Sequence, residues 1–269
     1  MNEKIKQQLD AQKSPLIAKV LVTFVLVAIL VWSSTAVDLT SLSTSGFAVA
    51  KNIIKGILKP DLELLFATGT SGVGYLLLET ICIAFLGTVV GAVIALPLSF
   101  LGASNIVPKP IAWVSRTFVM AVRTIPTFVY GLMFIRVSGP GAFAGLMTMG
   151  VCSVGMVSKM YIESIEDLDI RILESLDAAG CNTFQKIRYG VLPQLMPDFA
   201  STMIYRFDMN LRDATVLGLV GAGGIGAPLI FAMNASKWNQ VGSILIGLMV
   251  LVLIVEAISS RIRMKLTRG

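Results

Sequence analysis

The chain has 269 residues, of which 55% are hydrophobic and 14% are charged, with a mean hydropathy of +0.80. Soluble domains carry roughly 25% charged residues, so this composition excludes an ordinary soluble protein and predicts an all-α integral membrane protein. The net charge is +6. The excess lies near the ends of the predicted spans, so no nucleic-acid partner is expected.

Enzyme and metal chemistry have little support in the sequence. There is no histidine, which removes the commonest general base and the commonest metal ligand. Cys82, Cys152 and Cys181 have neither the spacing of a metal site nor that of a disulfide framework. No P-loop motif occurs. We therefore expect no catalytic residue, no metal ligand and no cofactor bound by this chain; if ATP drives the protein, another subunit binds it.

Residues 1–70 are predicted to hold a polar cytoplasmic segment, one span and an external amphipathic loop. Leu16 to Trp32 is apolar over nearly the ~20 residues that a spanning helix needs. Ser34-Thr35-Ala36 resembles a signal-peptide cleavage site, but the run exceeds the ~7–15 residues of a signal peptide, which favours an uncleaved span. The loop contains an amphipathic helix, which either lies on the membrane surface or packs on the outer end of the bundle. Its lysines recur at every fourth residue: Lys51, Lys55 and Lys59.

Three further spans are predicted from Tyr75 to Phe100, from Ile111 to Ile135 and from Ala142 to Tyr161. Gly87 and Gly91 in the first of them have the spacing of a close-packing helix face. Arg123 lies near the middle of the next span. A charge at that depth costs a few kcal/mol unless it faces water or a partner.

The longest polar interruption, residues 163–197, predicts two short helices with a break between them. Asp169 is placed to cap the first helix and Gly180 to end it. Asn182 or Thr183 is placed to cap the second, with Gln185 in the position of a capping box. The second is expected to end at Pro193 and Pro197. Such a pair between two spans is either a protrusion gripped by a partner or a plain solvated hairpin.

The fifth predicted span, Phe199 to Val220, holds five polar side chains: Arg206, Asp208, Asn210, Arg212 and Asp213. Groups of this kind inside a membrane face a wet interior or pair with one another. Guanidinium groups suit phosphate-like oxygens, so one interpretation is an anion pathway. The other is that Arg212 and Asp208, four residues apart, only neutralise each other.

Gly218 to Gly226 contains the G-x-G-x-x-G spacing of dinucleotide sites, but no βαβ unit surrounds it. A backbone bend at the membrane surface, or a re-entrant lining of a cavity, explains it better. Val241 to Ile258 is the last of six predicted spans, and a basic tail of residues 261–269 follows. Six spans put both termini on one side, and the basic residues on that side make it the cytoplasm. The polar interruption then lies in the cytoplasm too.

Parts of that interruption resemble the "EAA" loop of ABC importer permeases, which in that family sits in a groove of the cytoplasmic ATPase. The matching residues are Glu174, Gly180 and Leu192-Pro193. The match is partial: Ser175 and Leu176 replace two alanines of the family pattern, and Gly190 replaces its usual isoleucine. The resemblance implies a coupling loop formed by Glu174, Asp177, Ala178, Ala179, Gly180, Phe184, Leu192 and Pro193.

Two more runs, RTIPTFVYGLMF and YRFDMNLRDATVLGLVGAGGIG, are similar to the phosphonate-type ABC permeases. The resemblance covers roughly residues 70–260. It implies a six-transmembrane-helix bundle of the type I ABC importer permease kind, with a permease domain at residues 71–260 that holds five of the spans. The expected route for phosphonates or related phosphorus oxyanions is lined by Arg206, Asn210, Arg212 and Arg123.

The resemblance also implies an assembly in the cell membrane, among its lipids. Two copies of this chain form the pathway, two cytoplasmic ATPase subunits bind ATP and Mg²⁺, and an external substrate-binding protein delivers the cargo for alternating access. The chain itself catalyses no bond chemistry. The alternatives are the same architecture carrying phosphite, phosphate, methionine or a quaternary amine, and a polytopic membrane enzyme.

Overall fold

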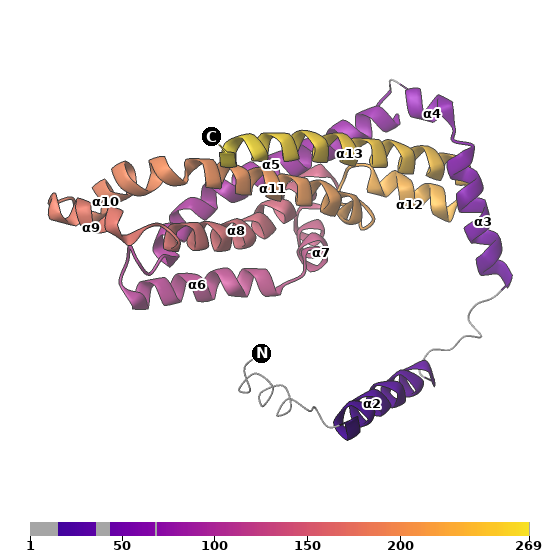
Figure 1. Cartoon of the computed structure of the whole chain (residues 1–269). Helices are drawn as coiled ribbons and strands as arrows, with labels where there is room; N and C mark the ends of the chain where they lie inside the picture. Colours follow the sequence, from indigo (N-terminus) through magenta and orange to yellow (C-terminus); the bar gives the residue numbers. More distant parts are fainter. Residues whose placement is uncertain (1–15, 36–43, 68, 269) are drawn as a thin grey trace. The chain divides into compact units, whose positions relative to one another are not determined.

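The computed structural model describes residues 16–35, 44–67 and 69–268, and every regular element within these ranges is helical (Figure 1). The chain divides into two compact units, residues 1–51 and residues 52–269. The second unit contains almost all of the helices and is the one that carries the candidate site.

The first unit contains α2 (Leu16–Thr35) and the beginning of α3 (Thr44–Leu58). The apolar stretch of α2, Lys19–Thr35, is shorter than the helices that are long enough to cross a membrane by themselves. The predicted polar segment and the last residue of the cleavage-like motif, Ala36, lie outside the described residues.

Four long helices of the second unit run side by side (Figure 1). They are α5 (Val73–Gly102), α8 (Ala142–Glu166), α11 (Leu192–Gly218) and α13 (Trp238–Arg268). Among the described residues, α5, α8 and α13 are long and apolar enough to cross a membrane on their own. α11 has 27 residues, but it carries the polar groups singled out in the sequence. The predicted tail, residues 261–269, continues α13 as far as Arg268.

Two glycines bring α5 and α8 into close contact. A Cβ on Gly87 would lie 2.4 Å from the Cβ of Met149, and one on Gly91 would lie 2.3 Å from the Cβ of Ser153. Both distances are far shorter than a carbon–carbon contact, so only glycine fits. The predicted close-packing face is therefore confirmed, and it brings Ser153 against α5.

The predicted third span, Ile111–Ile135, is wrong as a single helix. The chain forms α6 (Lys109–Thr124) and α7 (Thr127–Ser138), and their axes are bent by 83°. Pro126 is the reason, because proline has no N–H for the helix and forces the residue before it out of the helical region. Ile125 accordingly has φ −85° and ψ 122°. Together the two helices still have the length and hydropathy of one broken span.

The predicted hairpin consists of α9 (Ile170–Ala178) and α10 (Thr183–Lys186). Its expected end at two prolines is wrong. The chain passes from α10 through a π-helical turn, η2 (Ile187–Val191), directly into α11. Pro193 lies in the first turn of α11, where the missing N–H is tolerated, and Pro197 lies inside the helix.

The end of the bundle opposite the hairpin is formed by α4 (Leu62–Phe66), α12 (Gly226–Asn234) and the last turn of α3 (Figure 1). A Cβ on Gly242 of α13 would lie 2.1 Å from the carbonyl oxygen of Gly56. This contact supports the expectation that the amphipathic helix packs on the bundle, at least over its last turn.

The loop before α12 is the glycine-rich run of the sequence. Gly221, Gly223 and Gly224 all have positive φ, and Ala222 and Ile225 are buried. The Ile225 N–H donates to Thr80 Oγ1 of α5 at 3.0 Å. The run is therefore a tight backbone bend packed inside the bundle, with no strand before it in the described chain.

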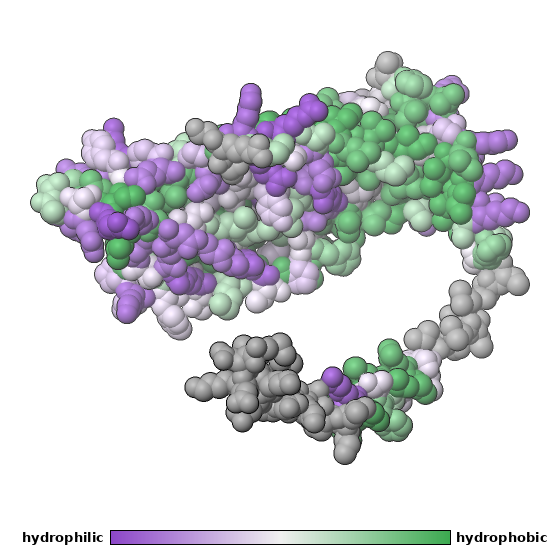
Figure 2. All heavy atoms as spheres, viewed as in Figure 1, coloured by the Kyte–Doolittle hydropathy of each residue, from purple (hydrophilic) through white to green (hydrophobic). Residues whose placement is uncertain are grey.

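Apolar packing anchors the hairpin to the bundle. Leu173 of α9 and Val191 of η2 are buried in one cluster with Tyr161 and Phe199, whose ring centroids are 4.2 Å apart. On the face seen in Figure 2, hydrophilic residues gather toward the α9–α10 end and hydrophobic residues toward α12 and the start of α13. On this face the hydrophobic residues therefore concentrate near α12 and the start of α13, and hydrophilic side chains also project at that end.

Candidate functional site

A buried polar row joins α11 to α5 and α8. Arg206 and Asn210 lie one turn apart on α11 and are almost fully buried. Arg206 Nε donates to Ser153 Oγ at 3.1 Å, and Asn210 Nδ2 donates to the same oxygen at 2.8 Å. Asn210 Nδ2 also donates to Thr88 Oγ1 of α5 at 2.8 Å. The two side chains therefore converge on one serine that the sequence did not single out.

The break between α6 and α7 opens a pocket onto this row. Its volume is about 160 Å³, and its lining residues are Val122, Arg123, Ile125, Thr127, Cys152, Met156 and Arg206. Arg206 approaches it from α11 with Nη1 3.2 Å from Met156 Sδ. Two of the four predicted pathway residues, from helices far apart in the sequence, thus line the same cavity.

Arg123 has an unusual environment for a charge inside a span. Its stem packs on Gly155 of α8, where a Cβ would lie 2.8 Å from Arg123 Cγ. Its guanidinium makes no hydrogen bond or ion pair with any described residue. Arg123 and Arg206 both line the pocket, and no acidic residue does, so its lining carries a surplus of positive charge. Such a cavity favours an anion.

Arg212 and Asn210 are the two predicted pathway residues that do not line this pocket; Asn210 still lies on the polar row, whereas Arg212 lies apart from it. Arg212 donates to Asp208 Oδ2 at 2.7 Å on its own helix and approaches Glu256 Oε2 of α13 at 3.4 Å. Its side chain is half exposed, whereas Asp208 is buried. The contacts of Arg212 are those of the structural pairing that the sequence left open as an alternative.

Two oxygens of this region have no partner. The buried Oδ1 atoms of Asp208 and Asn210 accept no hydrogen bond within the described part of the chain. A buried acceptor without a partner costs about 1–3 kcal/mol, and such atoms concentrate where water, an ion or a substrate enters. The one on Asn210 lies in the same polar row as Arg206.

The hairpin is held in shape by local interactions. The Asp169 carboxylate accepts from the Arg171 N–H, and Asn182 with Gln185 forms a complete capping box. Gly180 has φ +77°, the left-handed conformation that ends α9. The predicted caps are therefore confirmed. An ion pair between Lys186 and Asp177 ties α10 to α9.

The departures from the "EAA" pattern compensate each other. A Cβ on Gly190 would lie 2.4 Å from Leu176 Cδ1, so the larger side chain on α9 fills the space left by the smaller residue on η2. The hairpin keeps its packing, and its outer surface remains open. The predicted coupling residues at its tip are exposed, namely Glu174, Asp177, Ala178, Ala179, Gly180 and Phe184, whereas Leu192 is half-buried and Pro193 is exposed at the start of α11.

A polar clamp at the base of the hairpin was not found from the sequence. Glu166, the last residue of α8, accepts from the Ser104 N–H at 2.9 Å, from the Ser104 hydroxyl and from Arg116 of α6. Arg116 Nε also donates to the Gly102 carbonyl oxygen at 2.7 Å. The clamp fixes the loop between α5 and α6 beside the hairpin. Only the charges of Arg116 and Glu166 signalled it, and nothing in the spacing paired them.

Comparisons with known proteins agree with this architecture. A family model described as "Binding-protein-dependent transport system inner membrane component" matches residues 87–262. The phosphite transport system permease protein PtxC of Stutzerimonas stutzeri is 37% identical over 188 residues, which cover 70% of this chain and 68% of PtxC. The phosphate-import permease protein PhnE of Mycolicibacterium smegmatis is 31% identical over 189 residues, or 70% of this chain and 36% of PhnE.

Solved structures show the same fold at lower identity. An inward-facing structure of the MetNI methionine ABC transporter aligns with a TM-score of 0.62 and 20% identity, covering 71% of this chain and 94% of that one. An amino acid ABC transporter solved with histidines aligns with a TM-score of 0.58 and 17% identity, covering 85% and 99%. At these identities the likeness concerns the arrangement of the helices alone.

Proposed function

We infer that this chain, which belongs to the family of binding-protein-dependent transport system inner membrane components, is the permease subunit of an ABC importer and carries a small phosphorus oxyanion such as a phosphonate or phosphite. It is a non-catalytic membrane subunit of an ATP-driven complex. The observation that carries the choice of cargo is the pocket of about 160 Å³ that Arg123 and Arg206 share.

The chemistry of the pocket favours an oxyanion over the other cargoes. Guanidinium groups donate two parallel hydrogen bonds to phosphate-like oxygens, and Arg123 has no protein partner within the described chain that would occupy them. Val122, Ile125 and Met156 make part of the wall apolar, and a charge interaction beside apolar groups is stronger than one in bulk water. A quaternary amine requires aromatic faces, and no aromatic residue lines the pocket.

The relatives point to the same class of cargo. The names of those cited above specify phosphite and phosphate, and a further relative in Escherichia coli, 36% identical over 118 residues, is described as a putative cryptic phosphonate transport system permease. Permeases named for glycine betaine also match, but at 20–21% identity. Asn210, next to Arg206 on the polar row, is proposed to line the route as well, whereas Arg212 is proposed to support α11 through Asp208.

The complete transporter is proposed to contain two copies of this chain, two cytoplasmic ATPase subunits that bind ATP and Mg²⁺, and an external substrate-binding protein. The hairpin is the proposed seat of the ATPase, because its tip is exposed and its surface carries uncovered apolar side chains: Ile170 at the start of α9, Phe184 on α10 and Tyr189 in η2. The basic C-terminal end of α13 points to the same end of the bundle (Figure 1). Under the positive-inside rule this end is proposed to be cytoplasmic, and with six spans both termini are proposed to lie on that side of the membrane.

Growth on defined phosphorus sources tests the cargo. A strain lacking this gene is supplied with a phosphonate, phosphite or phosphate as its sole phosphorus source. We expect loss of growth on phosphonate or phosphite, with rescue by the wild-type gene and no rescue by an Arg123→Gln/Arg206→Gln double variant that still reaches the membrane. Normal growth of the deletion strain on all three sources, in a background without a second importer, would refute the phosphorus cargo.

Substitution of Gly180 tests the coupling role of the hairpin. A Cβ at this position meets no atom within 4 Å, so a new side chain causes no clash and acts through the positive φ alone. Gly180→Leu is therefore expected to cost about 1–2 kcal/mol in the local conformation and to reduce co-purification of the ATPase. Gly180→Asn is the matched control, because asparagine tolerates this conformation. Equal recovery of the ATPase with both variants contradicts the proposed seat.

A further inference from the structure

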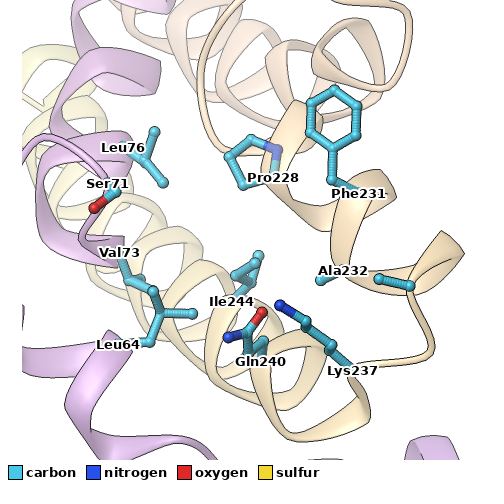
Figure 3. Close-up of a pocket in the computed structure, with 11 residues that line it drawn as sticks. Leu64, Ser71, Val73, Leu76, Pro228, Phe231, Ala232, Lys237, Gln240 and Ile244 are labelled. Carbon is cyan, nitrogen blue, oxygen red and sulfur yellow. The ribbon is translucent and has the colours of Figure 1, made fainter.

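A second cavity lies at the end of the bundle opposite the hairpin, between α4, α5, α12 and α13 (Figure 3). Its volume is about 380 Å³, within the range of roughly 300–1,000 Å³ typical of small-molecule sites. Its walls are mainly apolar and include the side chains of Leu64, Val73, Leu76, Pro228, Phe231 and Ile244. It is remote from the arginine pocket and shares no residue with it.

One cation stands at the edge of this apolar cavity. Figure 3 shows the amino group of Lys237 and the amide of Gln240 close together on one side of the cavity. The Lys237 ammonium makes no ion pair or hydrogen bond with any residue in the described ranges. The Asp61 carboxylate caps α4 by accepting from the Leu64 N–H at 3.2 Å, and it forms no ion pair with Lys237. No acidic side chain lines the cavity, so no described carboxylate is paired with this ammonium.

The same two residues also border open surface. Lys237 and Gln240 line a shallow hollow of about 360 Å³ formed by residues 236–240, outside the apolar cavity. The cation therefore stands where an apolar, partly open cavity meets the exterior. This order, apolar inside and charged at the mouth, matches an amphiphile that inserts its chain and leaves its headgroup at the rim.

The cavity also lies at headgroup level. Lys237 and Trp238 directly precede and begin α13, whose apolar stretch extends from Trp238 to Leu266. Lysine and tryptophan at the end of a span mark the boundary between hydrocarbon and water. The N-terminus of α13 adds a partial positive charge at this point. An anionic group next to Lys237 would therefore lie at the depth of the lipid phosphates.

We propose that this cavity is a binding site for one anionic phospholipid, whose acyl chain lies among the apolar side chains and whose phosphate is held by Lys237 and Gln240. An inorganic anion would leave the apolar walls without a contact, and a lipid without net charge would leave the charge of Lys237 without a counter-charge. The site is independent of the cargo, because it shares no residue with the arginine pocket.

Native mass spectrometry of the full-length permease in detergent tests the proposal. The protein is titrated with phosphatidylglycerol or with phosphatidylethanolamine of the same chain length. We expect one phosphatidylglycerol to be retained preferentially, and Lys237→Gln to weaken that binding roughly tenfold, as loss of one charge-assisted hydrogen bond does. The matched control is Lys59→Gln, which removes an exposed lysine from the same end of the bundle that does not line the cavity.

A second variant tests the acyl-chain part. Ala235 lines the cavity but is exposed, so Ala235→Trp narrows the space without disturbing the core or the charge. It is expected to weaken retention of phosphatidylglycerol, whereas millimolar inorganic phosphate is expected not to displace the lipid. Equal retention of the two lipids by the wild type, an equal effect of Lys59→Gln, or displacement by phosphate alone would each overturn the proposal. Failure of the growth test leaves this result unaffected.

Discussion

Replacing Arg123 separates a transport role from a structural one, because the structure gives its charge no internal partner. Arg123→Gln keeps the Cβ and Cγ atoms that pack on Gly155, so the helix contact survives. Exposed substitutions of this kind change stability by about 0.5 kcal/mol or less. Folding and assembly are therefore expected to stay at wild-type levels.

The effect on transport is expected to be much larger. A hydrogen bond to a charged group contributes about 1.5–3 kcal/mol, and each ~1.4 kcal/mol is a factor of ten in affinity. Loss of the Arg123 guanidinium should thus raise the KM for uptake roughly tenfold to a hundredfold. Arg123→Lys retains the charge without the two-pronged geometry and should fall between the wild type and Arg123→Gln.

The assay is uptake of a radiolabelled phosphonate or phosphite over a range of concentrations, with the amount of assembled complex measured in the same membranes. Arg136→Gln is the matched control. Arg136 is an exposed arginine at the end of α7, with no ion pair inside the described chain and no place in the pocket. If Arg123→Gln raises KM no more than Arg136→Gln does, the anion pocket is refuted.

Two further substitutions test the packing that supports the site. Gly91→Val places a Cβ 2.3 Å from Ser153 and is expected to destabilise the protein by about 3 kcal/mol. Thermal unfolding in detergent measures this, and Gly74→Val, with open space around its Cβ, should leave the Tm nearly unchanged. Glu166→Gln removes the carboxylate that pairs with Arg116 and is expected to lower the free energy of unfolding by about 1 kcal/mol. The loss is no larger because the Arg116–Glu166 pair is partly exposed. Glu166→Gln should also speed amide exchange in residues 103–107, whereas Glu163→Gln, which loses only an i,i+4 pair, should do neither.

Features set by neighbouring residues were predictable from the sequence. The capping box at Asn182 needs only a side chain three residues away, and the turn at Gly180 needs only its own φ. The close-packing face at Gly87 and Gly91 was also predictable from spacing, because two small residues one turn apart in a span usually mark a close helix–helix contact. What the sequence did not reveal was the partner helix, because spacing defines a face but not its neighbour.

Features that depend on distant neighbours were missed or misread. The polar groups on α11 have regular spacing, but only the position of Ser153 on α8 and of Glu256 on α13 separates the role of Arg206 from that of Arg212. The bend at Pro126 was hidden because hydropathy averaged over Ile111–Ile135 is insensitive to one missing hydrogen bond. At Pro126 the effect of proline was underestimated, whereas at Pro193 it was overestimated. Pro193 was expected to end a helix, but it lies in the first turn of α11.

The uninterrupted passage from the hairpin into α11 has a mechanical consequence. About 14 residues of helix, or roughly 21 Å at 1.5 Å per residue, separate the start of α11 from Arg206. Between the hairpin, which is the proposed seat of the ATPase, and Arg206 there is no flexible linker in which a displacement would be lost. Compliance is concentrated in the π-helical turn and at Pro197, where the hydrogen-bond ladder is irregular. A displacement of the hairpin is therefore expected to move α11 and Arg206 with it, with bending confined to residues 187–197. Faster amide exchange over residues 187–197 than in the rest of α11 would reveal this flexible segment.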